Sequence, residues 1–219
     1  MTFAFPFSPF LSLSLFLSFS LSLSFSLLLP LSSYHVFCVL QQLPYYIEGK
    51  LKLTQSLTIL NYLARRHRLD GQSDEEKRRI DVLEQQLRDY RNRFIDVSLD
   101  PNFEKLKNQF LKNLPFMLES LSIFLGTRPY FAGNNITYVD FIAYEFIDQF
   151  YYLNAATFDK FINLKQFLKR FENLPTIYEY QHAENYRRWP SGLLIKWYES
   201  KYSSTFHRCG SGSPLDKLS

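Results

Sequence analysis

The residues best placed for binding chemistry are Gln55 and Ser56, which stand where a helix is expected to begin. The first backbone N–H groups of a helix have no partner within it, and the helix dipole adds partial positive charge, so this position favours a carboxylate. Leu43-Pro44 leads into the segment that delivers this pair. Taken alone, Gln55 and Ser56 are better explained as an ordinary helix cap, so the pair does not by itself indicate a binding site.

Other patterns that would carry chemistry are missing. The sequence has no glycine-rich phosphate loop, no nucleophile elbow and no pair of histidines at helical spacing. A surface or packing role is favoured over metal binding or catalysis for each scattered histidine: His35, His67, His182 and His207. Two cysteines, Cys38 and Cys209, form no disulfide framework, which favours a reducing, cytoplasmic compartment. A net charge of only +4 argues against nucleic acid as a partner.

A hairpin followed by a helix is expected to position Gln55 and Ser56. Residues 43–47 are rich in β-forming types and residues 50–54 alternate between apolar and polar, with Glu48-Gly49 as the turn between two antiparallel strands. Apolar residues then recur at helical spacing and predict a helix over residues 56–67. Because two strands alone are marginally stable, something must pack on the hairpin.

The rest of the chain is predicted to be helical. Capping boxes at Ser73 with Glu76 and at Thr137 with Asp140 mark two helix starts. Pro115 lies inside an apolar helical pattern, where it is expected to bend or break the helix. The expected helices cover residues 73–100, 102–126, 138–150 and 164–171, and one more begins at 175. The fold class is therefore mainly α, a helical bundle with a fragment of sheet attached.

Residues 1–42 differ from everything that follows. From residue 3 to residue 33 the chain uses only Phe, Leu, Ser and Pro, apart from Ala4, and no charged residue precedes Glu48. Codons that begin with two pyrimidines encode these four amino acids, so we hypothesise that the segment is intron read-through from a pyrimidine-rich tract upstream of a splice acceptor. An export signal or a membrane span is the alternative, although the segment lacks a basic start and serines dilute its apolar content.

A family resemblance rests on several separate motifs. Residues 52–67, residues 102–107 and the loop Arg128-Pro-Tyr-Phe-Ala-Gly133, followed by residues 136–141, resemble the mu class of glutathione S-transferases in order and spacing. The match covers roughly residues 43–197. It implies a cytoplasmic homodimer that conjugates glutathione, as co-substrate and with no other cofactor, to hydrophobic electrophiles in detoxification. Residues 43–70 would be the remnant of a thioredoxin-like domain, 71–200 the all-helical C-terminal domain and 201–219 a frayed tail.

The resemblance also implies a set of site residues. In the family, the bend before a cis-proline holds the cysteinyl part of glutathione, a Gln-Ser pair holds its γ-glutamyl end, and an acidic residue reaches the partner subunit's glutathione. The glutathione-binding residues would be Gln42, Leu43, Pro44, Gln55, Ser56 and Asp89. Ile95 and Leu99 fall where the family lines its electrophile pocket, and many mu enzymes have a tyrosine at the position of Leu99.

One departure from the family bears on activity. The tyrosine that donates to the glutathione sulfur, and the strand that carries it, have no counterpart here, because Tyr34 is the one tyrosine before the hairpin and its surroundings do not match. We therefore expect the chain as it stands to be a transferase by family but inactive or nearly so, with no catalytic residue assigned. The alternatives are a non-catalytic dimeric binding or scaffold protein and, less favoured, a membrane-anchored form.

Overall fold

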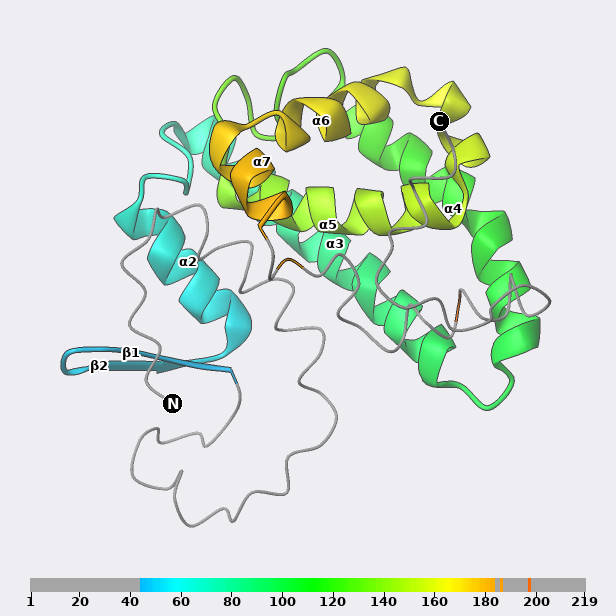
Figure 1. The fold of residues 1–219 in the computed structure, drawn as a ribbon, viewed down its shortest axis with the longest axis horizontal. Coiled ribbons are helices and arrows are strands. Elements are labelled where there is room, and N and C mark those ends of the chain that lie inside the picture. The colour runs from blue at the N-terminus through cyan, green and yellow to red at the C-terminus, as the bar shows by residue number, and fades with distance from the viewer. Residues whose placement is uncertain (1–43, 184–185, 187–196, 198–219) are drawn as a thin grey trace, which may run out of the picture.

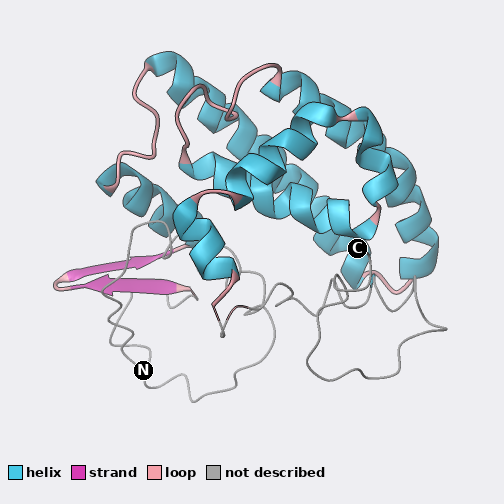
Figure 2. Ribbon diagram, turned by 45° about the horizontal axis from the view of Figure 1, so that its top comes forward, coloured by secondary structure: helices cyan, strands magenta, loops and turns pink. Residues whose placement is uncertain are grey.

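The structure is a computed structural model that describes residues 44–183, 186 and 197. Most of the described chain is helical, and the one sheet among the described residues is a two-stranded hairpin at one side of the helices (Figures 1 and 2). This confirms the mainly α fold class. The elements, in chain order, are β1 (Tyr45–Glu48), β2 (Leu51–Thr54), α2 (Ser56–Arg66), α3 (Asp74–Leu99), α4 (Phe103–Leu125), α5 (Tyr138–Leu153), the 3₁₀ helix η2 (Ala155–Lys160), α6 (Ile162–Glu172) and α7 (Pro175–Gln181).

The hairpin forms as expected, with one shift in its turn. Tyr45 pairs with Thr54 and Glu48 pairs with Leu51, so the two loop residues are Gly49 and Lys50 instead of Glu48 and Gly49. The turn moves because Gly49 takes a positive φ of 56°, which glycine adopts without steric cost. Glu48 thereby stays in β1, on the face that packs against α2.

Helix α2 is the element that packs on the hairpin. Tyr46 lies 6.0 Å from the Tyr62 ring between centroids, and Glu48 accepts hydrogen bonds from the Tyr62 hydroxyl at 3.1 Å and from Arg66. The opposite face of the hairpin is exposed at Tyr45 and Ile47. Arg66 of α2 therefore pairs with a carboxylate of β1.

Both predicted capping boxes are present. The Glu76 N–H donates to the Ser73 hydroxyl at 3.1 Å, and the Glu76 carboxylate accepts from the Ser73 N–H at 3.2 Å. Asp140 accepts from the N–H of Thr137 at 2.8 Å and from its hydroxyl at 2.9 Å. The same carboxylate accepts from the Phe131 N–H at 2.8 Å, so it also holds the preceding loop.

Helix α4 contains Pro115 and runs through it unbroken, which corrects the expectation of a break. A proline inside a helix removes one hydrogen bond and costs about 3 kcal/mol. Leu114, Met117 and Leu118 beside it are almost fully buried, and each fully buried apolar side chain contributes about 1.5–3 kcal/mol. Burial on both sides of the proline thus outweighs its local cost, while Pro115 itself faces solvent.

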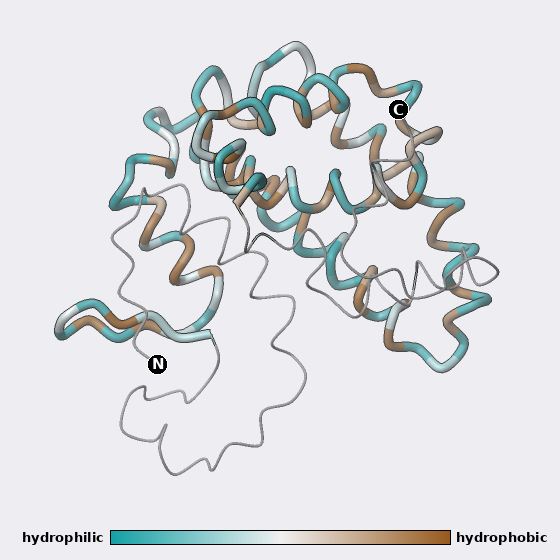
Figure 3. Tube along the Cα trace, viewed as in Figure 1, coloured by the Kyte–Doolittle hydropathy of each residue, from teal (hydrophilic) through white to brown (hydrophobic). Residues whose placement is uncertain are grey.

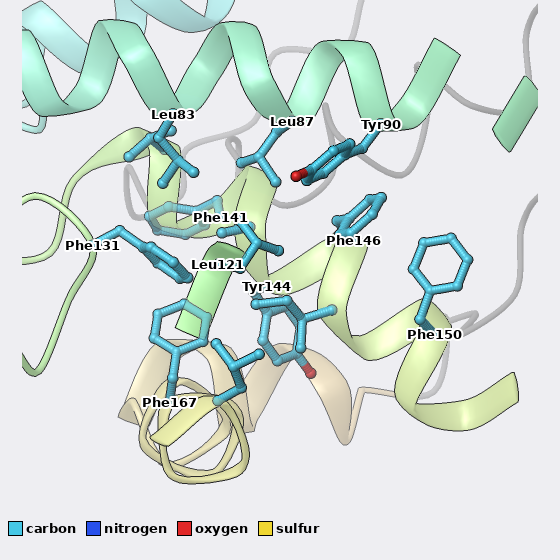
Figure 4. Close-up of a cluster of buried hydrophobic side chains, with 14 of the residues drawn as sticks. Leu83, Leu87, Tyr90, Leu121, Phe131, Phe141, Tyr144, Phe146, Phe150 and Phe167 are labelled. Atoms are coloured by element: carbon cyan, nitrogen blue, oxygen red, sulfur yellow. The ribbon is translucent and has the colours of Figure 1, made fainter. Parts of the chain in front are cut away.

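Aromatic side chains make up much of the core. Leu83, Leu87 and Tyr90 of α3 point toward Phe141 and Phe146 of α5 (Figure 4). Colouring by hydropathy shows brown, apolar stretches recurring along each helix between teal ones (Figure 3). Such alternation is typical of helices with one buried face.

Trp197, the last residue that the structure describes, packs against α3. The Trp197 ring stacks on Phe94 with 5.1 Å between centroids, and its indole N–H donates to the Ser98 hydroxyl at 2.7 Å. Trp197 is fully buried. The structure also forms η2, which the sequence did not indicate, and it extends α5 to Leu153.

Candidate functional site

The start of α2 has an unusual backbone. Gln55 stands at the N-cap position with φ 72° and ψ 115°, and its carbonyl accepts the first helical hydrogen bond from the Ile59 N–H at 3.0 Å. A positive φ in a residue other than glycine costs about 1–3 kcal/mol and persists only where the surrounding structure enforces it. Gln55 is exposed and Ser56 is half-buried, so both are accessible to a ligand.

The hairpin brings Pro44 to the same place. Because Tyr45 pairs with Thr54, the next position along the register sets Pro44 opposite Gln55, at the end of the hairpin where α2 begins. Gln42 and Leu43, which the resemblance assigns to the same site, lie outside the described residues. The strained N-cap and the proline are therefore neighbours, although ten residues of chain separate them.

A cavity of about 300 Å³ opens beside this junction, between α2, α3 and α5. Gln55 and Ser56 line it from α2, and Arg88 and Arg91 line it from α3. Apolar side chains make up much of its wall: Leu57, Leu60, Leu87, Phe94, Ile142, Phe146 and Phe150. A mostly apolar cavity with a few convergent polar groups is the usual form of a small-molecule site.

Two opposite charges from different helices meet in this cavity. Burial is the main cause that raises the pKa of Glu145 to about 6, and the nearby charge of Asp148 also raises this pKa. The Gln149 amide, which donates to the Glu145 carboxylate at 2.9 Å, and the charge of Arg91 lower the same pKa. Burial lowers the pKa of Arg91, and the Glu145 charge raises it. Both groups are thus held in surroundings that disfavour their charged forms, yet each supports the charge of the other.

A second carboxylate, Glu84, fastens α2 to the helical bundle. It accepts from the Tyr138 hydroxyl at 2.7 Å and from the Asn61 amide at 3.5 Å, which joins α2, α3 and α5. Burial, followed by the Glu84 hydrogen bond and charge, raises the pKa of Tyr138. The network fixes the helix whose first turn carries Gln55 and Ser56.

The remaining residues assigned through the resemblance lie elsewhere on α3. Asp89 is exposed and does not line the cavity, although its neighbour Arg88 does. Ile95 is half-buried, and Leu99 at the end of α3 is 64% exposed. The structure therefore brings Pro44, Gln55 and Ser56 together and leaves Asp89, Ile95 and Leu99 outside their cavity.

Sequence analysis missed Arg91, Glu145 and Glu84. The available signal was a charged residue inside a strongly apolar helix, since Glu145 lies between Tyr144 and Phe146 in α5. Such a residue is usually paired when it is buried. Its partner could not be read from the sequence, because Arg91 lies on another helix.

Within the part of the chain that the structure covers, no group of three or more His, Cys, Asp or Glu side chains is arranged to hold a metal ion. No helix in that part is long and apolar enough to cross a membrane. His182 stacks on Tyr178 with 4.0 Å between ring centroids, and His35 and His207 lie outside the described residues.

The fold agrees with what known proteins show. Residues 88–184 match the model of the glutathione S-transferase C-terminal domain. Two solved structures are similar. The glutathione S-transferase Blo t 8 matches with a TM-score of 0.60 and 32% identity, over 65% of this chain and 69% of that chain. The pi-class glutathione S-transferase of Onchocerca volvulus matches with a TM-score of 0.64 and 27% identity, over 78% of this chain and 85% of that chain. These define a glutathione S-transferase fold.

Curated relatives give the class. Glutathione S-transferase Mu 1 of Rattus norvegicus is 46% identical over 156 residues, which are 71% of this chain and 72% of that protein. Glutathione S-transferase Mu 5 of Homo sapiens is 46% identical over 153 residues, 70% of this chain and 69% of that protein. The chain belongs to the glutathione S-transferase family, and its relatives are of the mu class.

Proposed function

We propose that this chain is a glutathione transferase that holds the γ-glutamyl end of glutathione at Gln55 and Ser56 and the cysteinyl backbone at Leu43 and Pro44. The observation that carries the proposal is the meeting of Pro44 with a strained N-cap at Gln55, in a chain 46% identical to a mu-class transferase. Helix α2 offers unpaired N–H groups to a carboxylate, and Ser56 adds a hydroxyl.

The reaction needs only glutathione and an electrophile. The glutathione sulfur attacks an electrophilic carbon, a sulfur–carbon bond forms, the leaving group departs with its electron pair, and the thiol proton passes to solvent. The nucleophilic form is the thiolate, which an unperturbed thiol with a pKa near ~8.5 supplies only in small amount at neutral pH. A group that donates to the sulfur would therefore set the rate, and no cofactor enters the proposal.

We propose that activity is low in the chain as it stands. The family's sulfur-binding tyrosine has no counterpart in this sequence, and losing one preorganised donor to a developing anion typically costs ~10²–10³ in rate. Substrate binding at Gln55 and Ser56 does not depend on that donor. Binding and turnover should therefore separate, with binding retained and turnover reduced.

Further parts of the proposal follow the family. The chain forms a homodimer in the cytoplasm, Asp89 reaches the glutathione of the partner subunit, and Ile95 and Leu99 line the electrophile pocket. Exposure of Asp89 and Leu99 supports these roles, since both must contact something outside their own subunit's core. Residues 1–42 remain assigned to intron read-through, and spliced messages continuous across the codons for residues 40–43 would refute that assignment.

Calorimetric titration of glutathione into the full chain tests the binding site. Ser56→Ala should weaken binding by roughly tenfold, because a hydrogen bond to a charged group contributes about 1.5 kcal/mol or more. Thr58→Ala, which changes an exposed side chain two positions further along the first turn of the same helix, should have no effect. Equal affinity of the Ser56 variant and the unaltered chain would overturn the assignment. Turnover of a chloronitrobenzene at the rate of a complete mu enzyme would overturn the impairment.

A non-catalytic dimeric binding or scaffold protein is the second candidate. It is favoured by the contrast between the helical core and the described sheet, which has two strands. It predicts a dimer in sedimentation experiments that binds no immobilised glutathione. Glutathione binding that Ser56→Ala weakens would exclude it.

A further inference from the structure

We propose that the cavity between α2, α3 and α5 binds an apolar α-amino acid in its zwitterionic form. The ligand's ammonium group would contact the Glu145 carboxylate, its carboxylate would contact the Arg91 guanidinium, and its side chain would lie among the apolar wall residues. This binding needs no glutathione and no turnover. Gln55 and Ser56, which the transferase proposal assigns to glutathione, line the same cavity, but the ligand proposed here would contact Arg91 and Glu145, so the two proposals have separate tests.

The size of the cavity suits such a ligand. At about 300 Å³ it stands at the small end of ligand sites, which run from about 300 to 1,000 Å³. Leu57 and Leu60 of α2 line this space, and so do Phe146 and Phe150 of α5. One aliphatic or aromatic side chain can be buried there.

The charges select a zwitterion over a simple ion. Arg91 and Glu145 reach the same cavity from α3 and α5, and each influences the pKa of the other. A purely cationic ligand would be attracted by Glu145 and repelled by Arg91, and a purely anionic ligand would meet the reverse. A ligand that carries both charges on substituents of one carbon atom can contact both groups, and the planar guanidinium matches a carboxylate in shape.

Other charged groups on the wall do not change this selection. Glu84 also lines the cavity, but its carboxylate accepts from Tyr138 and Asn61. Arg88 lies one turn before Arg91 and is exposed, so water screens its charge more than that of Arg91. Gln149 donates to Glu145 at 2.9 Å and thereby fixes the orientation of the carboxylate.

A ligand series on the unaltered full chain provides the first test. Calorimetric titration near neutral pH compares L-phenylalanine with phenethylamine, which lacks the carboxylate, and with 3-phenylpropionate, which lacks the ammonium group. We expect phenylalanine to bind roughly 10- to 100-fold more tightly than either, the effect of one charge-assisted hydrogen bond. L-glutamate carries the zwitterion without an apolar body and should bind more weakly than phenylalanine. Equal affinities across the series, or tighter binding of glutamate, would overturn the proposal.

Two variants assign the charges. Glu145→Gln should weaken phenylalanine binding about tenfold or more and should not weaken the binding of 3-phenylpropionate, which has no ammonium group. Arg91→Gln should weaken phenylalanine binding and should not weaken the binding of phenethylamine, which has no carboxylate. Glu119→Gln and Arg93→Gln are matched controls, since both residues are exposed and neither lines the cavity. Circular dichroism verifies that each variant is folded. Loss of phenylalanine binding in the controls, or its retention in both cavity variants, would refute the assignment. If a variant fails to fold, the ligand series on the unaltered chain still tests the proposal.

Discussion

Replacing Glu145 with glutamine should stabilise the folded chain at neutral pH. Burial raises the pKa of this carboxyl from 4.5 to about 6, even though Gln149 and Arg91 favour the ionised form. Each pKa unit corresponds to about 1.4 kcal/mol, so ionising Glu145 costs the folded state about 2 kcal/mol relative to the unfolded state. Glutamine has nearly the same shape and carries no charge. The variant should therefore be about 2 kcal/mol more stable near pH 7.

The sign of the pH dependence follows from the direction of the pKa change. A carboxyl whose pKa is raised in the folded state binds its proton more tightly there than in the unfolded chain. The stability of the unaltered chain should therefore increase as pH falls through about 6, until the unfolded carboxyl is protonated as well. The advantage of Glu145→Gln should shrink to below about 1 kcal/mol near pH 5 and vanish near pH 4.

Urea unfolding followed by circular dichroism measures this difference. The free energy of unfolding is determined for the unaltered chain and for Glu145→Gln at several pH values, with Glu119→Gln as the exposed control. The control should match the unaltered chain throughout. A Glu145 variant that is less stable at neutral pH would refute the reasoning, because it would mean that attraction to Arg91 outweighs the cost of burial.

Three other substitutions test the rest of the fold. Asp140→Ala leaves the buried N–H groups of Phe131 and Thr137 without an acceptor. The free energy of unfolding in urea should therefore fall by about 2–5 kcal/mol, and it should fall less in Asp140→Asn. Ser98→Ala removes the acceptor of the buried Trp197 N–H, so the free energy of unfolding should fall by about 1–3 kcal/mol. The tryptophan fluorescence should also change, and an unchanged spectrum would contradict the hydrogen bond. The Arg79 guanidinium donates to the carbonyls of Phe124 at 2.6 Å and Phe131 at 2.9 Å, and it lies 4.2 Å from the centroid of the Phe124 ring. Arg79→Met should therefore lower the free energy of unfolding by about 2 kcal/mol. Equal stability of Arg79→Lys and the unaltered chain would show that the planar group is not required.

Local signals in the sequence determined most of the helices. Ser73 and Thr137 with their acidic partners three residues later fixed two helix starts, since a capping box uses only neighbouring residues. The helices predicted over residues 73–100 and 102–126 are α3 (Asp74–Leu99) and α4 (Phe103–Leu125). These predictions were confirmed because each rests on interactions within a few residues of the chain.

Features that depend on tertiary contacts were predicted less well. Pro115 was expected to bend or break α4, and the helix is not broken, because its buried neighbours preserve it. The hairpin turn shifted by one residue because Glu48 is held by α2 through Tyr62 and Arg66. The cavity beside Gln55 was not predicted at all, since its wall comes from three helices that only packing brings together.

Gln55 and Ser56 are held in place from two sides. The buried face of α2, with Ile59 and Leu63 almost fully enclosed, packs within the same core as α3 and α5. The hairpin holds another side of the helix, since Glu48 of β1 accepts hydrogen bonds from Tyr62 and Arg66. Under the proposed function, substrate binding at α2 and stabilisation of the glutathione sulfur are therefore separable: these elements position Gln55 and Ser56, whereas the sulfur needs a donor of its own.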